Sequence, residues 1–449
     1  MNRTPRPSAG TEPGVHYAGG FPNCQAFFRP RTATHSAVAN SRFPRTLGRV
    51  NRDPLYDQTT EAEDLTAFDP AGADLTTLAD TPAESPGKGS QQLTANYKAI
   101  LRAKAIYYPV AYRFLKELGR GRQGVVFLGL RQGARGCVTR HAIKIFDPGI
   151  YPSAKKYWTD MGRIAAQTSK LQLVKSPNLV APEIYEESNG IGYIQMEVVD
   201  GVSLRYLLDG KHLELVKPFC TPAEWARFTD VIFRVQGGRI SIQPGIALYI
   251  MRQALRGLET LHEMGFVHSD IKPANIMIDR LGYVKLVDYG RAVRLNEKVS
   301  LLLGTPLYMA PEMHRREASI AQSDIYSVGA VGLEMLRGQP LLNPAGKSEP
   351  DLLNAKIEVV KKLPDLLPDH VRQNAQFVVL LQRFLDPEPN RRYLNAEEAE
   401  VGSQGLVLVH KQLAQLGKDT EYGRELENYL AKLMNPLPEP ADIPAAGRE

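Results

Sequence analysis

The apolar positions of the chain follow two patterns, one after the other. From Tyr112, short β-branched and aromatic runs alternate with glycines and basic turns, as in "YRFLKEL", "GVVFLGL" and "HAIKIF", which is typical of antiparallel strands. Beyond "GYIQMEVVDG", apolar residues recur at helical spacing and the runs end at glycine, as in "IALYIMRQALRGLETLHEMG" and "SDIYSVGAVGLEMLRG". The pattern therefore predicts a small sheet domain followed by a larger helical domain.

A further helical segment is expected between about residues 210 and 240. In "TPAEWARFTDVIFRVQGG", Thr221 and Glu224 have the spacing of a capping box, and Pro222 suits the first helical position. One face of the expected helix carries apolar side chains, namely Trp225, Phe228 and Ile232. We therefore interpret this segment as an inserted helix.

The two ends of the chain differ from its middle. Residues 1–95 are rich in Pro, Gly, Ser, Thr and Ala and lack sustained periodicity, which predicts a disordered or flexible extension. Its basic residues cluster before Asn51 and its acidic residues cluster after it, but a solvated linker is the favoured interpretation. Within residues 401–449, "GLVLVHKQLAQLGKDTEYGRELENYLAKLM" predicts two amphipathic helices that support the fold rather than dock a partner.

Composition limits the classes of function. With 449 residues, 43% apolar and 23% charged, the chain can bury a sizeable core. The net charge of +6 comes without a dense Lys/Arg block, so nothing favours a nucleic-acid partner. Cys24, Cys137 and Cys220 lack the spacing of a zinc site or disulfide framework, which favours a reducing, cytoplasmic compartment. No apolar run reaches the roughly 18 to 20 residues of a membrane span, and the first residues lack a secretory apolar core.

The stretch "HSDIKPANIMIDRLGYVKLVDYG", residues 268–290, spaces four polar groups between short apolar runs. Moving the terminal phosphoryl group of a nucleotide to a hydroxyl requires metal ions, a group that orients the hydroxyl, and positive charge. Asp270 can orient the hydroxyl and Lys272 can neutralise the migrating group, while Asn275 and Asp288 offer the oxygen ligands that Mg²⁺ prefers. A lone "DxxxxN" is more often a turn or a helix cap, so the whole arrangement carries the argument.

That arrangement resembles the catalytic loop and metal-binding triplet of the eukaryotic-type protein serine/threonine kinase family. "ELGRGRQGVVFLGL" is similar to the family's glycine loop, and "HAIK" would then contain the phosphate-binding Lys144. The resemblance implies catalysis by Asp270, Lys272 and Lys144, and Mg²⁺ ligation by Asn275 and Asp288. It implies that ATP is bound by Gly119, Gly121, Gly124, Val126, Ala142, Lys144, Met277 and, in the hinge between lobes, Met196, Glu197 and Val198.

"GTPLYMAPE" resembles the end of a kinase activation segment and places Thr305 near the substrate pocket. Glu312 would then pair with one of two arginines in "DPEPNRRY", Arg391 or Arg392, and the sequence leaves that choice open. Asp324 matches the helix residue that braces the catalytic loop in the family, although it also suits a helix N-cap. The lysine of the catalytic loop and the "GTxxYMAPE" form are similar to the serine/threonine branch of the family.

The first departure from the family pattern is Ser269, which replaces the arginine that normally grips a phosphorylated activation segment. We therefore expect activity without phosphorylation of that segment. Ser300 could be a phosphosite, but an exposed loop serine is the favoured interpretation. Tyr289 replaces the usual phenylalanine, which is a mild change because an aromatic ring is kept.

The second departure is Gln167, which stands where the family has the glutamate that pairs with Lys144. Asp160 lies two turns earlier on the same face, about 10 Å away along the helix axis, and Asp147 is a remoter candidate. We expect Lys144 to be held mainly by nucleotide and Asp288. On this interpretation Gln167→Glu raises activity or nucleotide affinity.

The resemblance covers about Tyr112 to Ala399 and implies an α+β, bilobal kinase-like fold, with an N-lobe at about 106–198 and a C-lobe at about 199–400. It implies a protein serine/threonine kinase that uses ATP and Mg²⁺ and acts on Ser/Thr hydroxyls of protein substrates. A nucleotide-binding pseudokinase that acts as a signalling scaffold is the alternative. A small-molecule phosphotransferase of related fold is less favoured, because such relatives generally lack the "APE" segment. Pathway and oligomeric state stay open.

Overall fold

The computed structural model describes the chain from Lys88 to Met434, with short gaps. The described residues are 88–107, 110–133, 135, 137–288, 292–298, 306–342, 348–415 and 421–434. Most of the predicted extension, together with Tyr289, Ser300 and Thr305, lies outside the described residues. All described residues belong to one compact unit.

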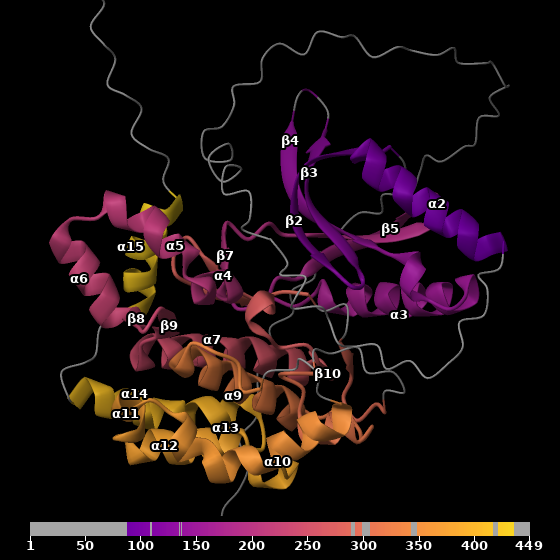
Figure 1. Cartoon of the computed structure of the whole chain (residues 1–449). Coiled ribbons are helices and arrows are strands. Elements are labelled where there is room, and N and C mark those ends of the chain that lie inside the picture. The colour runs from indigo at the N-terminus through magenta and orange to yellow at the C-terminus, as the bar shows by residue number, and fades with distance from the viewer. Residues whose placement is uncertain are drawn as a thin grey trace, which may run out of the picture. The chain divides into compact units, whose positions relative to one another are not determined.

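An antiparallel sheet of six strands forms the N-terminal part, as the alternating apolar runs predicted (Figure 1). Its strand order is β1-β2-β3-β4-β6-β5. The strands are β1 (Ala105–Ile106), β2 (Tyr112–Gly121), β3 (Gly124–Gln132), β4 (Val138–Phe146), β5 (Pro182–Ser188) and β6 (Ile191–Met196). The second half of β4 is continuously buried, which explains why apolar residues occupy all of its positions except Lys144.

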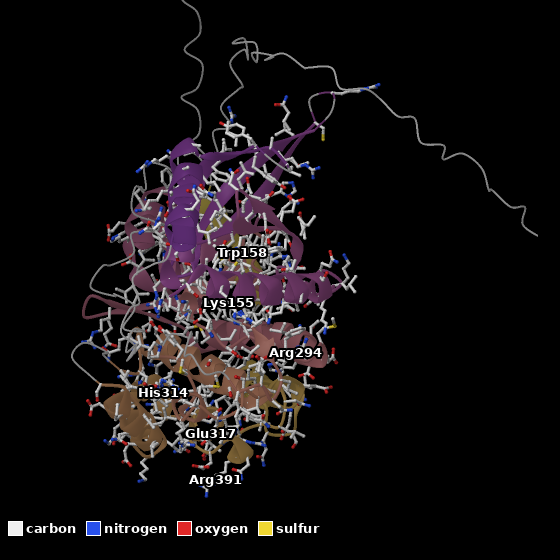
Figure 2. The ribbon with its side chains drawn as sticks, turned by 90° about the vertical axis from the view of Figure 1, so that its right-hand side faces the viewer. Lys155, Trp158, Arg294, His314, Glu317 and Arg391 are labelled. Carbon is white, nitrogen blue, oxygen red and sulfur yellow. The ribbon has the colours of Figure 1, made fainter. Side chains whose placement is uncertain are left out.

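Two helices share the apolar core of this sheet, namely α2 (Lys88–Ala103) and α3 (Ala154–Leu171). Figure 2 shows Lys155 and Trp158 on α3. The extension predicted to reach residue 95 is therefore too long, because α2 begins at Lys88. The boundary was missed because the segment before residue 95 has the composition of a linker. The amphipathic spacing of α2 becomes visible only from Leu93, through its buried side chains Leu93, Tyr97 and Ile100.

The C-terminal part is mainly helical, as predicted. Its two longest buried elements, α7 (Pro244–Glu263) and α9 (Ala321–Arg337), pack against each other in the centre of one large apolar core. The surrounding helices are α4 (Leu204–Asp209), α5 (Lys211–Val216), α8 (Pro311–His314), α10 (Glu349–Leu366), α11 (Asp369–Arg372), α12 (Ala375–Phe384) and α13 (Ala396–Val401).

Two small sheets frame the segment that carries the predicted catalytic residues. One has the order β12-β11-β7, and the other pairs β10 with β13. The elements are β7 (Gly201–Ser203), β10 (Phe266–Val267), the short 3₁₀ helix η6 (Pro273–Asn275), β11 (Ile276–Asp279), β12 (Val284–Leu286) and β13 (Val293–Arg294). The loop from His268 to Lys272 thus lies between two anchored elements.

The inserted segment is only partly helical. Helix α6 (Pro222–Val231) begins with the predicted capping box between Thr221 and Glu224, but it ends before Ile232. A hairpin of β8 (Phe233–Gln236) and β9 (Arg239–Ile242) follows, so the helix expected to continue to about residue 240 is wrong there. The reason is the Gly-Gly pair between the strands, whose two φ angles of +59° and +75° suit a tight hairpin turn.

The two C-terminal amphipathic helices are present as α14 (Leu406–Gln415) and α15 (Tyr422–Met434). Helix α15 buries Leu426, Tyr429 and Leu430 in the large core, and the Tyr429 hydroxyl bonds the ring of buried His212 in α5. This packing agrees with the expected supporting role. Among the helices that the structure describes, none has both the length and the hydrophobicity needed to cross a bilayer.

A buried ion pair fastens the start of α8 to the C-terminal core. Glu312 accepts two hydrogen bonds from the Arg392 guanidinium, at 2.7 and 2.8 Å, and both side chains are at most 1% exposed. Ser323 donates a further bond of 2.8 Å to the same carboxylate. The choice between the two arginines is therefore settled in favour of Arg392, while neighbouring Arg391 is exposed (Figure 2).

We expect Arg392→Met to lower the free energy of unfolding by about 3–5 kcal/mol, because it leaves the carboxylate of Glu312 buried without its partner. Arg391→Met removes the same charge from an exposed position and should change the free energy by less than about 0.5 kcal/mol. Urea denaturation of both variants measures the difference. Equal losses would contradict the assignment.

Candidate active site

Lys144 projects from β4 toward the end of β12. It is 5% exposed and forms an ion pair with Asp288, which follows β12 closely in the chain. It also donates a 3.3 Å hydrogen bond to the side chain of Gln123 in the β2–β3 turn. The structure thus brings together the predicted phosphate-binding lysine and one predicted metal ligand, although they are 144 positions apart.

The register of the sheet places the predicted adenine-contacting residues on one face. Val126 pairs with Lys144, and Ala142 pairs with Met196 two positions along the same strand. Since side chains two positions apart share a face, these four side chains lie on the same side of the sheet. Met277 comes from β11, opposite Lys285. Of the two hinge residues that follow Met196, Glu197 is exposed and pairs with Lys285 at 2.9 Å, and Val198 is partly buried.

Asp324, at the start of α9, holds the loop between β10 and η6. Its fully buried carboxylate accepts hydrogen bonds from the backbone N–H groups of His268 and Ser269, at 2.8 and 2.9 Å. The Nε2 atom of His262 is 2.9 Å from the same group. Ser269 has a φ of +64°, a left-handed conformation that costs a non-glycine residue about 1–2 kcal/mol. The side chain of Asp324 therefore compensates for a strained turn.

Two of the predicted groups, Lys272 and Asn275, converge on the carboxylate of the third, Asp270. The Oδ2 atom of Asp270 lies 3.2 Å from the Nζ atom of Lys272 and 3.1 Å from the Nδ2 atom of Asn275. The same Nδ2 atom donates to the backbone carbonyl of Asp270 at 2.8 Å. Val287, next to Asp288, donates its N–H to the carbonyl of Asn275 at 3.0 Å. One continuous set of contacts therefore joins this loop to the residues near Lys144.

The description "protein kinase domain" belongs to the family whose model matches residues 112–400, well over half of the chain. The chain belongs to the protein kinase family. The antiparallel N-lobe, the helical C-lobe and the order of the motifs agree with this assignment.

Three relatives illustrate how distant the similarity is. A probable serine/threonine-protein kinase, pknA2 of Bifidobacterium longum, is 28% identical over 236 residues, which cover 51% of this chain and 26% of the relative. PknB of Mycolicibacterium smegmatis is 30% identical over 238 residues, covering 50% and 32%. Human ribosomal protein S6 kinase alpha-6 is 25% identical over 324 residues, covering 71% and 37%. The aligned part of the chain thus spans 26% to 37% of the length of these relatives.

The helix that usually pairs with the kinase lysine makes a different contact here. Gln167 of α3 donates to the backbone carbonyl of Ala292 at 2.6 Å, and Arg163 donates to the same carbonyl at 2.9 Å. Neither Asp160 nor Asp147 replaces the missing glutamate, because Asp160 bonds Tyr151 and Arg163 while Asp147 caps a short 3₁₀ helix. Sequence reasoning placed Gln167 on α3 but missed this contact with the segment after Asp288.

A second contact that the sequence did not reveal fixes the segment before α8. Lys356 of α10 is fully buried and donates to the carbonyls of Pro306 and Met309, the second at 2.6 Å. Its Nζ atom also lies 2.9 Å from the Nε2 atom of His314. Burial lowers the pKa of Lys356 to about 7 and, together with the nearby Lys356, that of His314 to about 3. The neutral imidazole of His314 can therefore accept a hydrogen bond from the third N–H group of the ammonium.

The three glycines of the kinase glycine loop have different local roles. A β-carbon on Gly119 or Gly121 would meet no atom within 4 Å, whereas one on Gly124 would lie 1.8 Å from the carbonyl oxygen of Ile145. Gly124 also has a φ of +145°. The absence of side chains at the first two positions keeps open space, while Gly124 permits β3 to pack closely against β4.

We expect Gly124→Ala to lower the free energy of unfolding by about 2 kcal/mol or more, since the added methyl group collides with backbone and the φ angle is unfavourable. Gly121→Ala should leave thermal stability nearly unchanged, because the added methyl group meets no atom within 4 Å, and should raise the KM for ATP, because it adds bulk at a proposed nucleotide-binding glycine. Thermal denaturation and initial-rate kinetics separate the two effects. Equal destabilisation by both variants would disprove the distinction.

Proposed function

We propose that this chain is an active serine/threonine kinase that transfers the γ-phosphoryl group of ATP to hydroxyl groups of protein substrates, with Mg²⁺. The set of contacts that joins Lys144 and Asp288 to Asp270, Lys272 and Asn275 carries the proposal. These are the charges and oxygen ligands that phosphoryl transfer needs, and they come from separate parts of the chain. The serine/threonine kinases among its relatives support the same class of acceptor.

On this proposal each of these side chains has a separate task. Asp270 would accept or orient the proton of the acceptor hydroxyl, and Lys272, 3.2 Å away, would supply positive charge beside the transferred group. Lys144 would bind the phosphates from its position on β4. Because the Nδ2 atom of Asn275 donates to Asp270, its Oδ1 atom is the acceptor of that amide and can ligate a cation. The oxygens of Asn275 and Asp288 suit Mg²⁺, which would neutralise charge on the phosphates.

Activity independent of phosphorylation in the activation segment is part of this proposal. Position 269 carries a hydroxyl instead of a guanidinium, so it offers no cation to a phosphate group. The backbone of the same residue is already held by Asp324 at 2.9 Å. The catalytic loop is therefore ordered by a buried carboxylate within the C-lobe.

A nucleotide-binding scaffold without catalysis is the second candidate. It is favoured by the contact of Gln167 with Ala292, which leaves Lys144 without the usual carboxylate of α3. Lys144 instead pairs with Asp288, a residue that the proposed reaction requires for Mg²⁺. The described contacts of Gln167 do not include Lys144. That Gln167→Glu raises activity therefore stays a prediction.

A cytoplasmic location belongs to the same proposal. Cys137 and Cys220 are free thiols, one exposed and one partly buried. Reduced cysteines are typical of proteins in reducing compartments.

We expect Asp270→Asn to reduce kcat for phosphorylation of a generic protein substrate by at least about 100-fold, because it removes the group that accepts the hydroxyl proton. The KM for ATP should change little. Asp230→Asn, at an exposed position in α6, is the matched control and should retain full activity. Mass shift of the substrate in the presence of ATP and Mg²⁺ measures transfer.

The same experiment distinguishes the two candidates. Nucleotide binding by both wild type and variant without any transfer would establish the scaffold and overturn the kinase proposal. Transfer that persists in Asp270→Asn would refute the role given to Asp270.

We also expect the wild-type protein, after treatment with a phosphatase, to retain its initial rate within about twofold, since Ser269 cannot bind a phosphorylated segment. Intact mass before and after treatment verifies removal of phosphate. A drop of more than about tenfold that recovers on phosphorylation would show that the loop needs the modification.

A further inference from the structure

The β8–β9 hairpin has two chemically different faces. Its register pairs Phe233 with Ile242 and Arg234 with Ser241. Phe233, Ile240 and Ile242 are buried in the large core. The alternate positions, which carry Arg234 and Arg239, therefore face away from that core.

The polar face of the hairpin lines a cavity of about 340 Å³. The opposite wall comes from the end of α9 and the segment around α11. The lining residues are Arg234, Gln236, Gly237, Arg239, Ser241, Arg337, Pro368 and His370. None of these lining residues is acidic. Three of them are arginines, two from the hairpin and one from the end of α9.

Close packing fixes the two walls relative to each other. Gly338 ends α9 with a φ of +68°, and a β-carbon there would lie 2.0 Å from the carbonyl oxygen of Ile240 in β9. The backbone of the hairpin thus lies directly against the end of α9. The fold therefore brings the backbone positions of Arg239 and Arg337 close together.

The side chains that line the cavity carry a net positive charge. Within the described part of the chain, no carboxylate pairs with Arg234, Arg239 or Arg337, and the one contact found for Arg337 is a 3.3 Å bond to the carbonyl of Pro340. Burial and the nearby charge of Arg239 lower the pKa of the Arg337 guanidinium. Like charges that lie close together repel each other, and a bound anion would remove that repulsion.

We propose that this cavity is a binding site for a phosphoryl group. Guanidinium groups present paired N–H donors that match phosphate oxygens, which makes arginine clusters well suited to such a ligand. Asp324 and Arg337 lie at opposite ends of α9, about 20 Å apart along its axis. The site is therefore distinct from the catalytic loop and does not depend on the proposed kinase reaction.

The test uses the full chain and two double variants. Arg234→Gln with Arg239→Gln removes two charges from the cavity and spares the partly buried Arg337. Arg391→Gln with Lys362→Gln removes two exposed charges elsewhere and is the matched control. The probes are inorganic phosphate, followed by ³¹P NMR, and a short serine peptide with and without phosphate, followed by fluorescence anisotropy at constant ionic strength.

We expect the cavity variant to bind inorganic phosphate or the phosphopeptide at least about tenfold more weakly than wild type and the control, with unchanged thermal stability and basal phosphotransfer. Any phosphate bound in the nucleotide cleft contributes equally to all three proteins. Tighter binding of the phosphopeptide than of inorganic phosphate would identify a protein side chain as the source, and the reverse would identify the free ion. Equal affinities of the cavity variant and the control for both probes would overturn the proposal.

Discussion

The catalytic side of this molecule depends on the buried carboxylate of Asp324. This carboxylate accepts hydrogen bonds from the backbone N–H groups of two consecutive loop residues, one of them in a left-handed conformation. It also contacts His262. A carboxylate placed in the core is tolerated because these donors satisfy it. From this anchor the loop extends to Asp270 and Asn275, and Asn275 in turn bonds the backbone beside Asp288. The positions of the proposed catalytic groups in this loop thus depend on one buried carboxylate inside the C-lobe, while Lys144 is positioned by β4.

Much of this arrangement could be predicted from sequence because it rests on local patterns. The apolar runs predicted strands β2, β3 and β4, and the Thr221 capping box predicted the start of α6. The family resemblance singled out Lys144, Asp270, Asn275 and Asp288, which the folded chain joins through one set of contacts. The boundary at residue 95 was wrong because the linker-like composition of this region was more evident than the short helical periodicity of α2. The hairpin after Val231 was missed because the apolar positions before the Gly-Gly pair fit helical spacing as well as alternation.

Contacts between distant side chains could not be predicted in the same way. The pattern of α3 shows that Gln167 faces inward, but only the folded chain shows that it meets the carbonyl of Ala292. The burial of Lys356 is even harder to foresee, since a lysine in an amphipathic helix is normally solvated. In both cases backbone carbonyls are among the partners, and they leave no signature in the amino-acid sequence.

The pKa of about 7 at Lys356 has a consequence for the segment next to Thr305, which the family resemblance places near the acceptor substrate. The protonated amine has three hydrogens for three acceptors, two carbonyls and one imidazole nitrogen. On the alkaline side of neutrality the neutral amine keeps only two, so one of these acceptors loses its donor. The attachment of the segment that precedes α8 therefore depends on pH, although Lys356, the residue that responds, is fully buried.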